Sequence, residues 1–434
     1  MAPSAHVQPP RGMRDFLPDE KARRDAVLGV IRDAFAAYGY REIETPALEE
    51  LGRLEASDEG DNAKLIFRVL RRGLDPSRPL RPSEAADLGL RFDLTVPLAR
   101  FYATHRAELP AVFRAIQVAP VWRAERPQRG RYRQFTQCDI DVIGEPGPLA
   151  EVELITATLG ALRRLGVDDV AVHLNDRVVL NALLDEVGVP AAAQAGVLVS
   201  IDKLDKVGVD GVAAELGAGG APAAAVERLV DLLRALAHPA GGTAGAWERA
   251  IEALPPGARA ATCGLSAIRA GVTAADPQAR LVADPTLVRG QGYYTGTIFE
   301  LRHPSSAGAV GGGGRYDGMV GRFAGVPVPA CGFSIGFERI VDLVDASRLM
   351  RPRRRVALVY GDGVEPGPLV AWQRRLIADG HEVRLVPRTR NLGRLLDGLA
   401  AEGFSEWAEV DPDTPPPDGG VDLARRHLTG PEAG

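Results

Sequence analysis

Two apolar stretches that flank an arginine-rich turn constrain the fold of this chain more than any other feature. Apolar side chains recur in residues 112–121 and 134–143, and a turn marked by proline and glycine joins them. This pattern predicts an antiparallel pair of strands. The turn from Arg123 to Arg133 holds five arginines and no lysine. Five like charges on a short hairpin repel each other without an anion, and the arginine fork grips phosphate oxygens in pairs, so the turn predicts a polyphosphate site.

The overall composition is that of an ordinary globular protein with no global attraction for nucleic acid. The chain has 434 residues, enough for two or three domains, of which 45% are apolar and 25% charged. The net charge is −5, so any contact with nucleic acid must use local basic patches. Arginine far outnumbers lysine along the whole chain. The clustering of arginines is therefore more informative than their number.

Cysteine, histidine and hydropathy patterns exclude several classes of protein. The three cysteines (Cys138, Cys263, Cys331) lie far apart, and the seven histidines show no metal-ligand spacing. We expect neither a disulfide framework nor a metal site built from protein ligands, and a reducing, cytoplasmic setting. No apolar run has membrane length, and residues 1–8 lack the regions of a signal peptide. We therefore expect a cytosolic protein that does not span a membrane.

Periodicity and turn residues predict the order of elements. Helices are predicted at 18–39, 95–104, 149–165 and 336–343, and further strands at 40–46, 65–70, 90–94, 170–174, 281–288 and 297–302. Residues 176–275 are rich in alanine and glycine, which indicates an inserted helical module. A basic linker at 350–355 precedes segments that alternate as βαβαβ: 356–360, 367–378, 382–386, 392–401 and 406–410. Residues 411–420 are typical of loop or disorder.

Three more clusters offer groups suited to a nucleotide. The chain has no Gly-Lys dipeptide, so a Walker A loop is excluded. Segment 288–296 carries Arg289 beside two tyrosines, 311–318 could form a floor free of side chains, and 332–339 leads into a helix with an arginine in its first turn. Each has an ordinary explanation: tyrosine pairs pack locally, glycine runs form loops, and single arginines pair at the surface. Their co-occurrence with the arginine-rich turn favours a ligand site.

The order of these motifs resembles class II histidyl-tRNA synthetases over about residues 10 to 345. The matching segments are 11–18, 38–46, 92–97, 123–133, 289–296, 312–317 and 332–339. The resemblance implies an α+β fold, in which an antiparallel sheet flanked by helices forms the catalytic domain (1–175 and 276–348). It also implies a helical insertion (176–275) and a short α/β anticodon-binding-like domain with a flexible tail (355–434).

The resemblance also implies roles for individual residues at the ATP end. Arg123 and Arg289 would be the catalytic residues, because a fixed cation stabilises the charge that grows on the α-phosphate as the substrate carboxylate attacks. The carboxylate is already ionised, so no general base is needed. Mg²⁺ would bind through the phosphates of ATP, with Glu125 as the one candidate protein contact. The implied ATP-binding residues are Arg123, Glu125, Arg131, Phe135 and Arg339.

The amino-acid end is implied in the same way. Asp93, Thr95 and Gln137 would grip the ammonium, and Asp141 and Tyr294 the two imidazole nitrogens. Arg289 and Tyr293 complete the amino-acid-binding set. We expect only one of the two aspartates at 139 and 141 to face the ligand, and favour Asp141.

Two departures from the family pattern leave alternatives open. Gln291-Gly292 stands where many members have Leu-Asp, which leaves histidine specificity open. The C-terminal unit matches only loosely, and its arginines suit either tRNA phosphates or a solvated helix face: Arg374, Arg375, Arg384, Arg388, Arg390 and Arg394. Arg126 and Arg129, nearer the tip of the turn, are assigned to structure or to the tRNA 3′ end.

Three functions are therefore compatible with the sequence. The leading one is ATP-dependent formation of histidyl-adenylate and charging of tRNA(His). The others are a tRNA-independent amino-acid-activating paralogue and, ranked lowest, a non-catalytic regulatory subunit of ATP phosphoribosyltransferase. The resemblance also implies a homodimer, with the helix from Asp19 and the strand at Pro46 in its interface.

Overall fold

The chain forms two compact units, Met1–Leu349 and Met350–Gly434. The computed structural model describes residues 7–56, 64–74, 81–127, 130–218, 222–237, 245–289, 293–345, 348–349, 354–415, 417 and 422–428. Gln291, Gly292 and Arg129, which the sequence singled out, lie outside these ranges.

The large unit is built on an eight-stranded sheet in the order β1-β5-β6-β11-β10-β9-β7-β8. Its edge pairs, β1 with β5 and β7 with β8, are parallel, and every pairing between them is antiparallel. The predicted α+β class is confirmed. The strands are β1 Arg41–Glu42, β5 Phe113–Trp122, β6 Gln134–Ile143, β7 Ala171–Asp176, β8 Arg280–Ala283, β9 Thr297–Arg302, β10 Gly311–Arg315 and β11 Ala330–Ile335.

The hairpin that brackets the arginine-rich turn is confirmed. Strands β5 and β6 pair without a break from Phe113 opposite Ile143 to Trp122 opposite Gln134. Alternate residues of β6, such as Cys138, Ile140 and Val142, are fully buried in the hydrophobic core. The residues between them, Asp139 and Asp141, are polar, as expected where one face of a strand meets the core and the other a polar site.

Helices cover the sheet and complete its core. Helix α5 (Leu149–Arg164) packs on β6 and β11, and α1 (Pro18–Ala37) and α12 (Cys263–Ala275) pack against α5. Val27, Ile31 and Phe35 of α1 are buried at helical spacing. Helix α4 (Thr95–His105) packs on α13 (Asp317–Ala324), and α14 (Phe337–Leu343) lies against β6.

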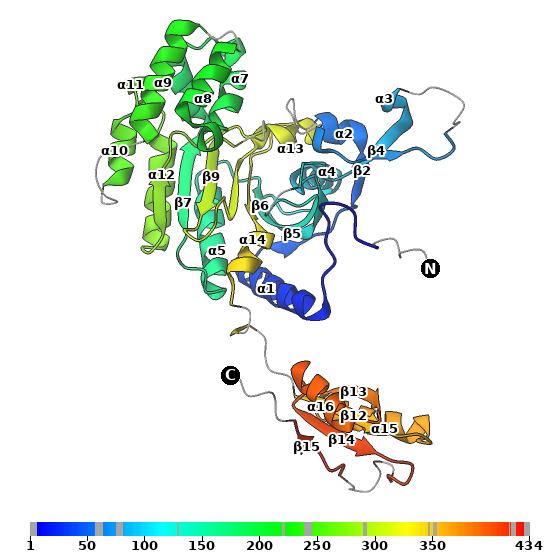
Figure 1. Ribbon diagram of the computed structural model, residues 1–434. Coiled ribbons are helices and arrows are strands. Elements are labelled where there is room, and N and C mark those ends of the chain that lie inside the picture. The colour runs from blue at the N-terminus through cyan, green and yellow to red at the C-terminus, as the bar shows by residue number, and fades with distance from the viewer. Residues whose placement is uncertain are drawn as a thin grey trace. The chain divides into compact units, whose positions relative to one another are not determined.

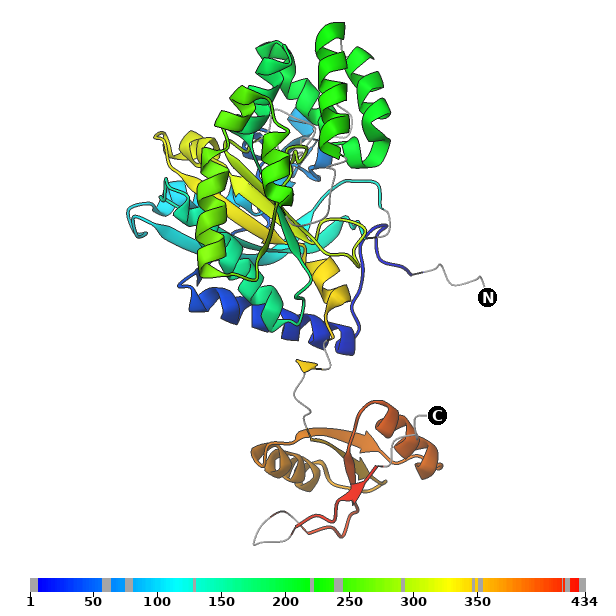
Figure 2. The ribbon, with the colours of Figure 1, turned by 90° about the vertical axis from the view of Figure 1, so that its left-hand side faces the viewer.

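The predicted helical insertion is a set of helices at one end of the large unit, opposite α1 (Figures 1 and 2). They are α6 Arg177–Glu186, α7 Ala191–Ile201, α8 Leu204–Ala218, α9 Ala223–Ala237, α10 Ala246–Glu252 and α11 Pro256–Ala260, followed by α12. Among the described residues, no single helix has the length and apolar character to cross a membrane. Helices α6 and α7 meet that criterion only as a pair, bent by 115°.

Two predicted strands differ from the structure because side chains stabilise turns there. The strand predicted at 90–94 is wrong: β4 ends at Leu90, and Asp93 Oδ1 accepts a hydrogen bond from Val96 N at 3.2 Å at the start of α4. The strand predicted at 281–288 ends at Ala283, because Asp284 Oδ1 accepts from both Thr286 N and Thr286 Oγ1. Strand β11 is indicated by the sequence only as the approach to a helix.

A small sheet in the order β2-β4-β3 flanks the N-terminal part of the large unit. Its elements are β2 Leu48–Glu50, α2 Leu51–Ala56, β3 Arg68–Leu70, α3 Pro82–Ala85 and β4 Ala86–Leu90.

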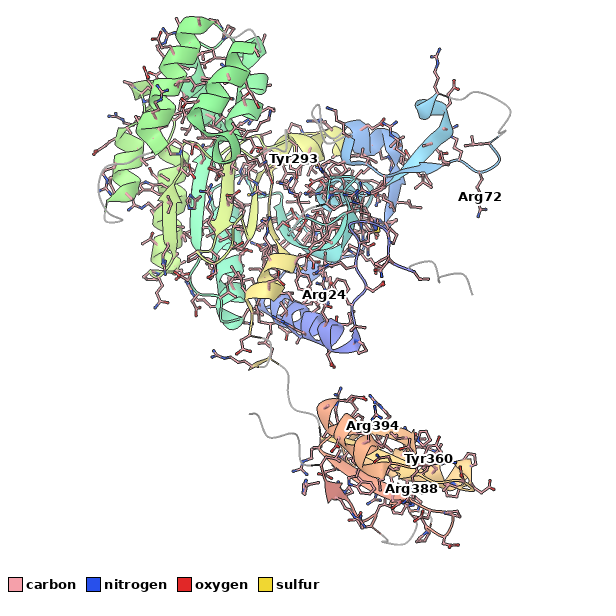
Figure 3. The ribbon with its side chains drawn as sticks, viewed as in Figure 1. Arg24, Arg72, Tyr293, Tyr360, Arg388 and Arg394 are labelled. Atoms are coloured by element: carbon pink, nitrogen blue, oxygen red, sulfur yellow. The ribbon has the colours of Figure 1, made fainter. Side chains whose placement is uncertain are left out.

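The second unit has the predicted βαβαβ order. Parallel strands β13, β12 and β14 form a sheet that the short antiparallel β15 extends. Separate apolar clusters around Trp372 and Trp407 support it. Figure 3 labels Tyr360, Arg388 and Arg394 on this unit. The elements are β12 Arg355–Tyr360, α15 Pro366–Ala378, β13 Glu382–Pro387, α16 Leu392–Ala401, β14 Glu406–Val410 and β15 Arg426–His427.

Candidate active site

One cavity of about 340 Å³ lies over strands β6, β10 and β11. All of the site residues proposed from the sequence line it, although they come from segments far apart in the chain. They are Asp93, Thr95, Arg123, Glu125, Arg131, Phe135, Gln137, Asp141, Arg289, Tyr293, Tyr294 and Arg339. Their individual roles remain predictions.

Arg123 is held in place at the mouth of the hairpin. Its Nε donates to the Phe92 carbonyl oxygen at 3.0 Å, and its guanidinium carbon lies 5.0 Å from the centroid of the Phe135 ring. Its backbone N–H donates to the Arg133 carbonyl, which closes the base of the arginine-rich turn. A cation and an aromatic face are thus fixed side by side, an arrangement suited to a phosphate next to a flat base.

Several cations share the same end of the cavity. Burial lowers the pKa of Arg339, and the positive charges of Arg131 and Arg289 lower it further. Arg131 pairs with Glu125 at 3.4 Å, and Arg339 donates to the Ala309 carbonyl. Cations that repel each other in a partly buried cavity favour a bound anion, because the anion relieves the repulsion. These groups fit the triphosphate of ATP.

The glycines of β10 and β11 make room for the chain's own side chains. A Cβ on Gly312 would lie 2.3 Å from Arg289 Nη1, and one on Gly332 would lie 2.0 Å from Asp141 Oδ1. A Cβ on Gly314 would meet the Tyr294 ring at 2.8 Å. The run 311–314, predicted as a floor for a flat ligand, is a central strand that lines the cavity. The side chains of Arg289 and Tyr294 lie where a Cβ on Gly312 or Gly314 would otherwise be.

Three buried carboxylates also line the cavity. Asp93, Asp139 and Asp141 are each less than 5% exposed. Burial raises the pKa of Asp139 to about 7, and it raises the pKa of Asp141 well above its ordinary value, with the charge of Asp139 adding to the effect. Buried carboxylates that disfavour each other's ionisation provide a site for a cationic ligand.

The expectation that only one of Asp139 and Asp141 faces the ligand is wrong. Both line the cavity, because residues two apart on a strand point to the same side of the sheet. Asp139 accepts from Gln137 Nε2 at 3.0 Å. Gln137 Oε1 is buried and has no hydrogen-bond partner within the described ranges. This acceptor suits the ammonium of an amino acid.

Tyr316 is a site residue that the sequence reasoning missed. Its hydroxyl donates to Asp141 Oδ1 at 2.6 Å, and its ring lies 6.2 Å from that of Tyr293. Tyr293 hydrogen-bonds with Thr95, and its ring lies 4.9 Å from that of Tyr294. Tyr316 falls within the quoted motif 312–317, so the signal was present, but its partner 175 residues away was not visible in the sequence.

Glu338 was also missed, and it ties the N-terminal segment to the cavity wall. Its carboxylate pairs with Arg24 of α1 at 2.6 Å and with Arg14 at 2.5 Å, and it accepts from Thr136 N at 3.1 Å. Figure 3 labels Arg24. Burial opposes the charge of Glu338, but the hydrogen bonds and charge of Arg24 lower its pKa overall. Arg14 also stacks over Tyr132, 3.7 Å from the ring centroid.

The cavity offers few ligands for a metal ion. In the part of the chain that the structure describes, no group of three or more His, Cys, Asp or Glu side chains has the arrangement of a metal site. Glu125 is an acidic side chain beside the cations, and Arg131 already pairs with it. The residues present fit a Mg²⁺ ion that arrives with the phosphates of a nucleotide better than one held by the protein alone.

Comparisons with known proteins agree with this geometry. The sequence model of the family described as histidyl-tRNA synthetase matches residues 12–340. The histidine--tRNA ligase of Leifsonia xyli subsp. xyli (strain CTCB07) is 54% identical over 94% of this chain and 96% of the relative.

Solved structures extend the likeness to the fold. The crystal structure of histidyl-tRNA synthetase from Nostoc sp. PCC 7120 superposes with a TM-score of 0.71 at 26% identity, covering 94% of this chain and 92% of that one. A Bacillus halodurans C protein titled ATP phosphoribosyltransferase regulatory subunit/histidyl-tRNA synthetase has a TM-score of 0.73, with 94% and 99% coverage, but at 21% identity it shows the fold alone. The cavity and the long, close match in sequence support one conclusion: the chain belongs to the histidyl-tRNA synthetase family.

Proposed function

We propose that this chain activates histidine with ATP to form histidyl-adenylate and transfers the histidyl group to tRNA(His). The observation that carries the proposal is one cavity lined both by clustered arginines and by buried carboxylates. The arginines fit a polyphosphate, and the carboxylates fit a cationic amino acid. Both substrates of an amino-acid-activating enzyme therefore meet where their reacting groups can join.

In the activation step, the carboxylate of histidine attacks the α-phosphate of ATP and pyrophosphate leaves. Arg123 and Arg289 are fixed cations that face the phosphate on which charge grows, and Arg123 is already oriented by the Phe92 carbonyl. Arg131 and Arg339 hold the outer phosphates, and Phe135 stacks on the adenine. Bound Mg²⁺ supplies further neutralisation of phosphate charge. Since the attacking carboxylate is ionised, the site needs no general base.

Recognition of the amino acid uses the carboxylates and the polar side chains beside them. Asp93 and Gln137 accept hydrogen bonds from the ammonium, and Asp141 and Tyr294 contact the imidazole. Because Tyr316 already donates to Asp141, the carboxylate is held in one orientation before the substrate arrives. Residues without two polar ring atoms would leave these buried groups unpaired, which penalises their binding.

The surface of the second unit supports a tRNA acceptor over a tRNA-independent activator. Arg375, Arg384 and Arg388 pair with acidic side chains. Arg390 and Arg394 are exposed, and no ion pair within the described residues involves them. They follow the carboxyl end of β13, where parallel sheets commonly bind ligands. A regulatory subunit without catalysis would have no need of Arg123, Arg289 and Arg339 in one cavity.

We further propose that the protein works as a homodimer in the cytoplasm. The N-terminal helix α1 and the segment at Pro46 form the expected interface. Three free cysteines, of which Cys138 and Cys331 are buried, are compatible with a reducing compartment.

Amino-acid-dependent exchange of pyrophosphate into ATP, measured beside charging of tRNA(His), tests the proposal. Exchange with histidine plus charging is expected. Exchange without charging would establish the tRNA-independent activator instead. No exchange with any amino acid would exclude both enzymes.

A further inference from the structure

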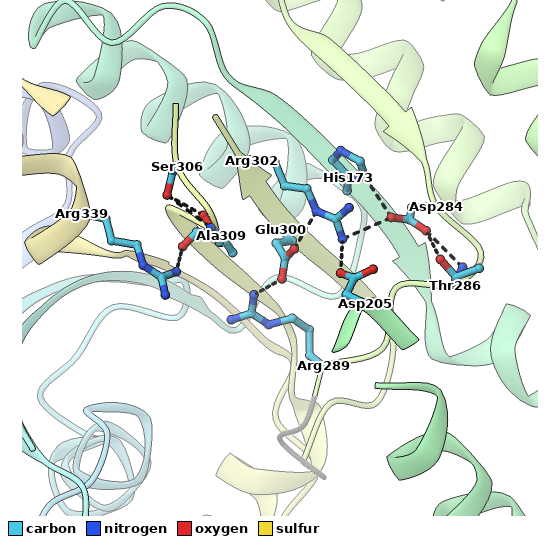
Figure 4. A network of polar contacts seen from close by, with 11 residues as sticks. His173, Asp205, Asp284, Thr286, Arg289, Glu300, Arg302, Ser306, Ala309 and Arg339 are labelled. Carbon is cyan, nitrogen blue, oxygen red and sulfur yellow. Dashed lines mark hydrogen bonds and ion pairs between the residues drawn. The ribbon is translucent and has the colours of Figure 1, made fainter. Parts of the chain in front are cut away.

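A carboxylate that no site prediction included holds the catalytic arginine. Glu300 of β9 accepts from Arg289 Nη1 through Oε2 at 3.0 Å, and from Arg302 Nε through Oε1 at 2.9 Å (Figure 4). The Glu300 side chain is 17% exposed and that of Arg289 is 26% exposed. Glu300 therefore bridges an arginine of the cavity and an arginine outside it.

Arg302 is itself anchored by acidic residues. Its Nη2 lies 3.7 Å from Asp284 Oδ2 and 3.5 Å from Asp205 Oδ2, and Asp284 also pairs with His173 at 2.9 Å (Figure 4). Burial alone would lower the pKa of Arg302, but its hydrogen bond to Glu300 and the charge of Asp284 raise it overall. Arg302 is thus a permanently charged group in a fixed position.

The contact between Glu300 and Arg302 determines how many N–H donors of Arg289 remain available to a ligand. A free carboxylate tends to bind an arginine with both oxygens, which occupies two of its donors. Here Arg302 occupies Oε1, so Glu300 holds Arg289 through one oxygen only. Among the described residues, Glu300 is the hydrogen-bond partner found for the Arg289 side chain, which leaves its remaining donors for a phosphate. Gly312, beneath Nη1, leaves the space in which the guanidinium lies.

We propose that Glu300 is a positioning residue for the activation step, and that Arg302 acts through it by limiting Glu300 to a one-oxygen contact with Arg289. This inference rests on the proposed function. Arg289 contacts the reacting phosphate, while Glu300 and Arg302 set its orientation. Loss of either should lower the rate of the chemical step more than the binding of histidine or ATP.

Histidine-dependent pyrophosphate exchange on the full chain tests this inference. We expect Glu300→Ala to lower kcat by about a hundredfold, the cost of misplacing a catalytic group by about 1 Å, with KM for histidine nearly unchanged. Glu300→Gln keeps one carbonyl acceptor for Arg289 and should retain more activity. Arg302→Ala should also lower kcat, because Glu300 can then bind Arg289 with both oxygens.

The double variant separates positioning from general stabilisation. If Arg302 acts through Glu300, Arg302→Ala added to Glu300→Ala causes no further loss. Glu248→Ala is the matched control: it removes a carboxylate that is 53% exposed and pairs with Arg269, away from the cavity, and should leave kcat within about twofold of wild type, since exposed ion pairs contribute little.

The outcomes distinguish the two levels of the proposal. Wild-type protein without histidine-dependent exchange overturns the proposed function itself. Wild-type exchange with unchanged kcat in Glu300→Ala overturns the positioning role. Additive losses of kcat in the Glu300→Ala, Arg302→Ala double variant also overturn the positioning role. So do equal changes, in either single variant, in kcat and in the KM values for histidine and ATP. Thermal unfolding of each variant identifies any that fail to fold, in which case Glu300→Gln decides.

Discussion

At the scale of single residues, the cavity brings like charges close together, and the protein's own ion pairs neutralise them only in part. Burial, with the charges of Arg131 and Arg289 beside it, lowers the pKa of Arg339, and burial raises the pKa of Asp139 to about 7. Buried like charges cost free energy in the empty protein. A zwitterionic substrate and a polyphosphate bring the missing charges, so part of their binding free energy comes from relieving these repulsions.

Arg289 should be essential for chemistry rather than for binding of the amino acid. Arg289→Ala is expected to lower adenylate formation by at least about a hundredfold, typical of losing a preorganised charge contact. Histidine binding, followed by calorimetry, should stay measurable. Arg53→Ala, on α2 and paired with Glu50, is the surface control. Unchanged exchange in Arg289→Ala would remove this residue from the catalytic role.

Binding of histidine should strengthen as pH rises through about 7. The folded pKa of Asp139, about 7, lies above its ordinary value of 3.8, so the empty protein holds a proton there below neutral pH. A cationic ammonium favours the ionised carboxylate, so KM for histidine should fall roughly tenfold from pH 6 to pH 8 through this group.

Asp139→Asn isolates that contribution. The imidazole of free histidine titrates in the same range with either protein, so the difference between the two pH profiles reports on Asp139. Parallel profiles for wild type and variant would show that Asp139 does not titrate on substrate binding. The raised pKa also affects stability. Between about pH 4 and about pH 7 the carboxyl of Asp139 is ionised in the unfolded chain but protonated in the fold, so the free energy of unfolding of the empty protein falls as pH rises through this range.

At the scale of elements, strand β10 is unusual because it has glycines where side chains from other segments occupy the space beside the strand. On its cavity face, Gly312 lies under Arg289 and Gly314 under Tyr294. On its other face, a Cβ at Gly313 would meet Phe299 at 2.7 Å. Glycine normally weakens a strand. Here, pairing with β9 and β11 on both sides stabilises it.

Gly312→Ala should therefore damage the site while Gly29→Ala improves stability. The new methyl at position 312 would collide with the Arg289 guanidinium at 2.3 Å, so pyrophosphate exchange should fall by about tenfold or more. Gly29 lies in α1, where an added methyl would have nothing within 4 Å, and alanine there should raise the free energy of unfolding by about 0.4–1 kcal/mol. Wild-type exchange rates in Gly312→Ala would contradict the packing argument.

At the scale of the whole molecule, we propose that activation and tRNA binding use separate units. The cavity lies entirely within Met1–Leu349, while Arg390 and Arg394, which form no ion pair with any described residue, belong to Met350–Gly434. Changes in the second unit should therefore act on tRNA and not on exchange.

Arg390→Ala and Arg394→Ala should raise KM for tRNA and leave pyrophosphate exchange unchanged. Each lost phosphate contact should reduce the salt dependence of tRNA binding by about one unit of log–log slope. Arg375→Ala is the control, because Asp379 already neutralises Arg375 at 3.3 Å. Equal salt slopes in all three variants would argue that this surface does not touch tRNA.

The sequence by itself predicted most of the elements and the hairpin around the arginine-rich turn, and through its resemblance to a family it pointed to the site residues that line the cavity, apart from Tyr316 and Glu338. Local periodicity, turn residues and short motifs carry that information. Prediction from the sequence was wrong where side chains stabilise a turn within a strand-like pattern, as at Asp93 and Asp284. It also missed contacts between residues that lie far apart in the chain.

Only the tertiary structure decided that β11 lies between β6 and β10, that the face shared by Asp139 and Asp141 lines the cavity, and that Glu300 bridges Arg289 and Arg302. These facts depend on long-range strand register and on which side chains enter one buried space. Local patterns do not encode register between distant strands, because any strand with the right alternation can pair. Packing in three dimensions selects one pairing, and that choice sets the geometry of the site.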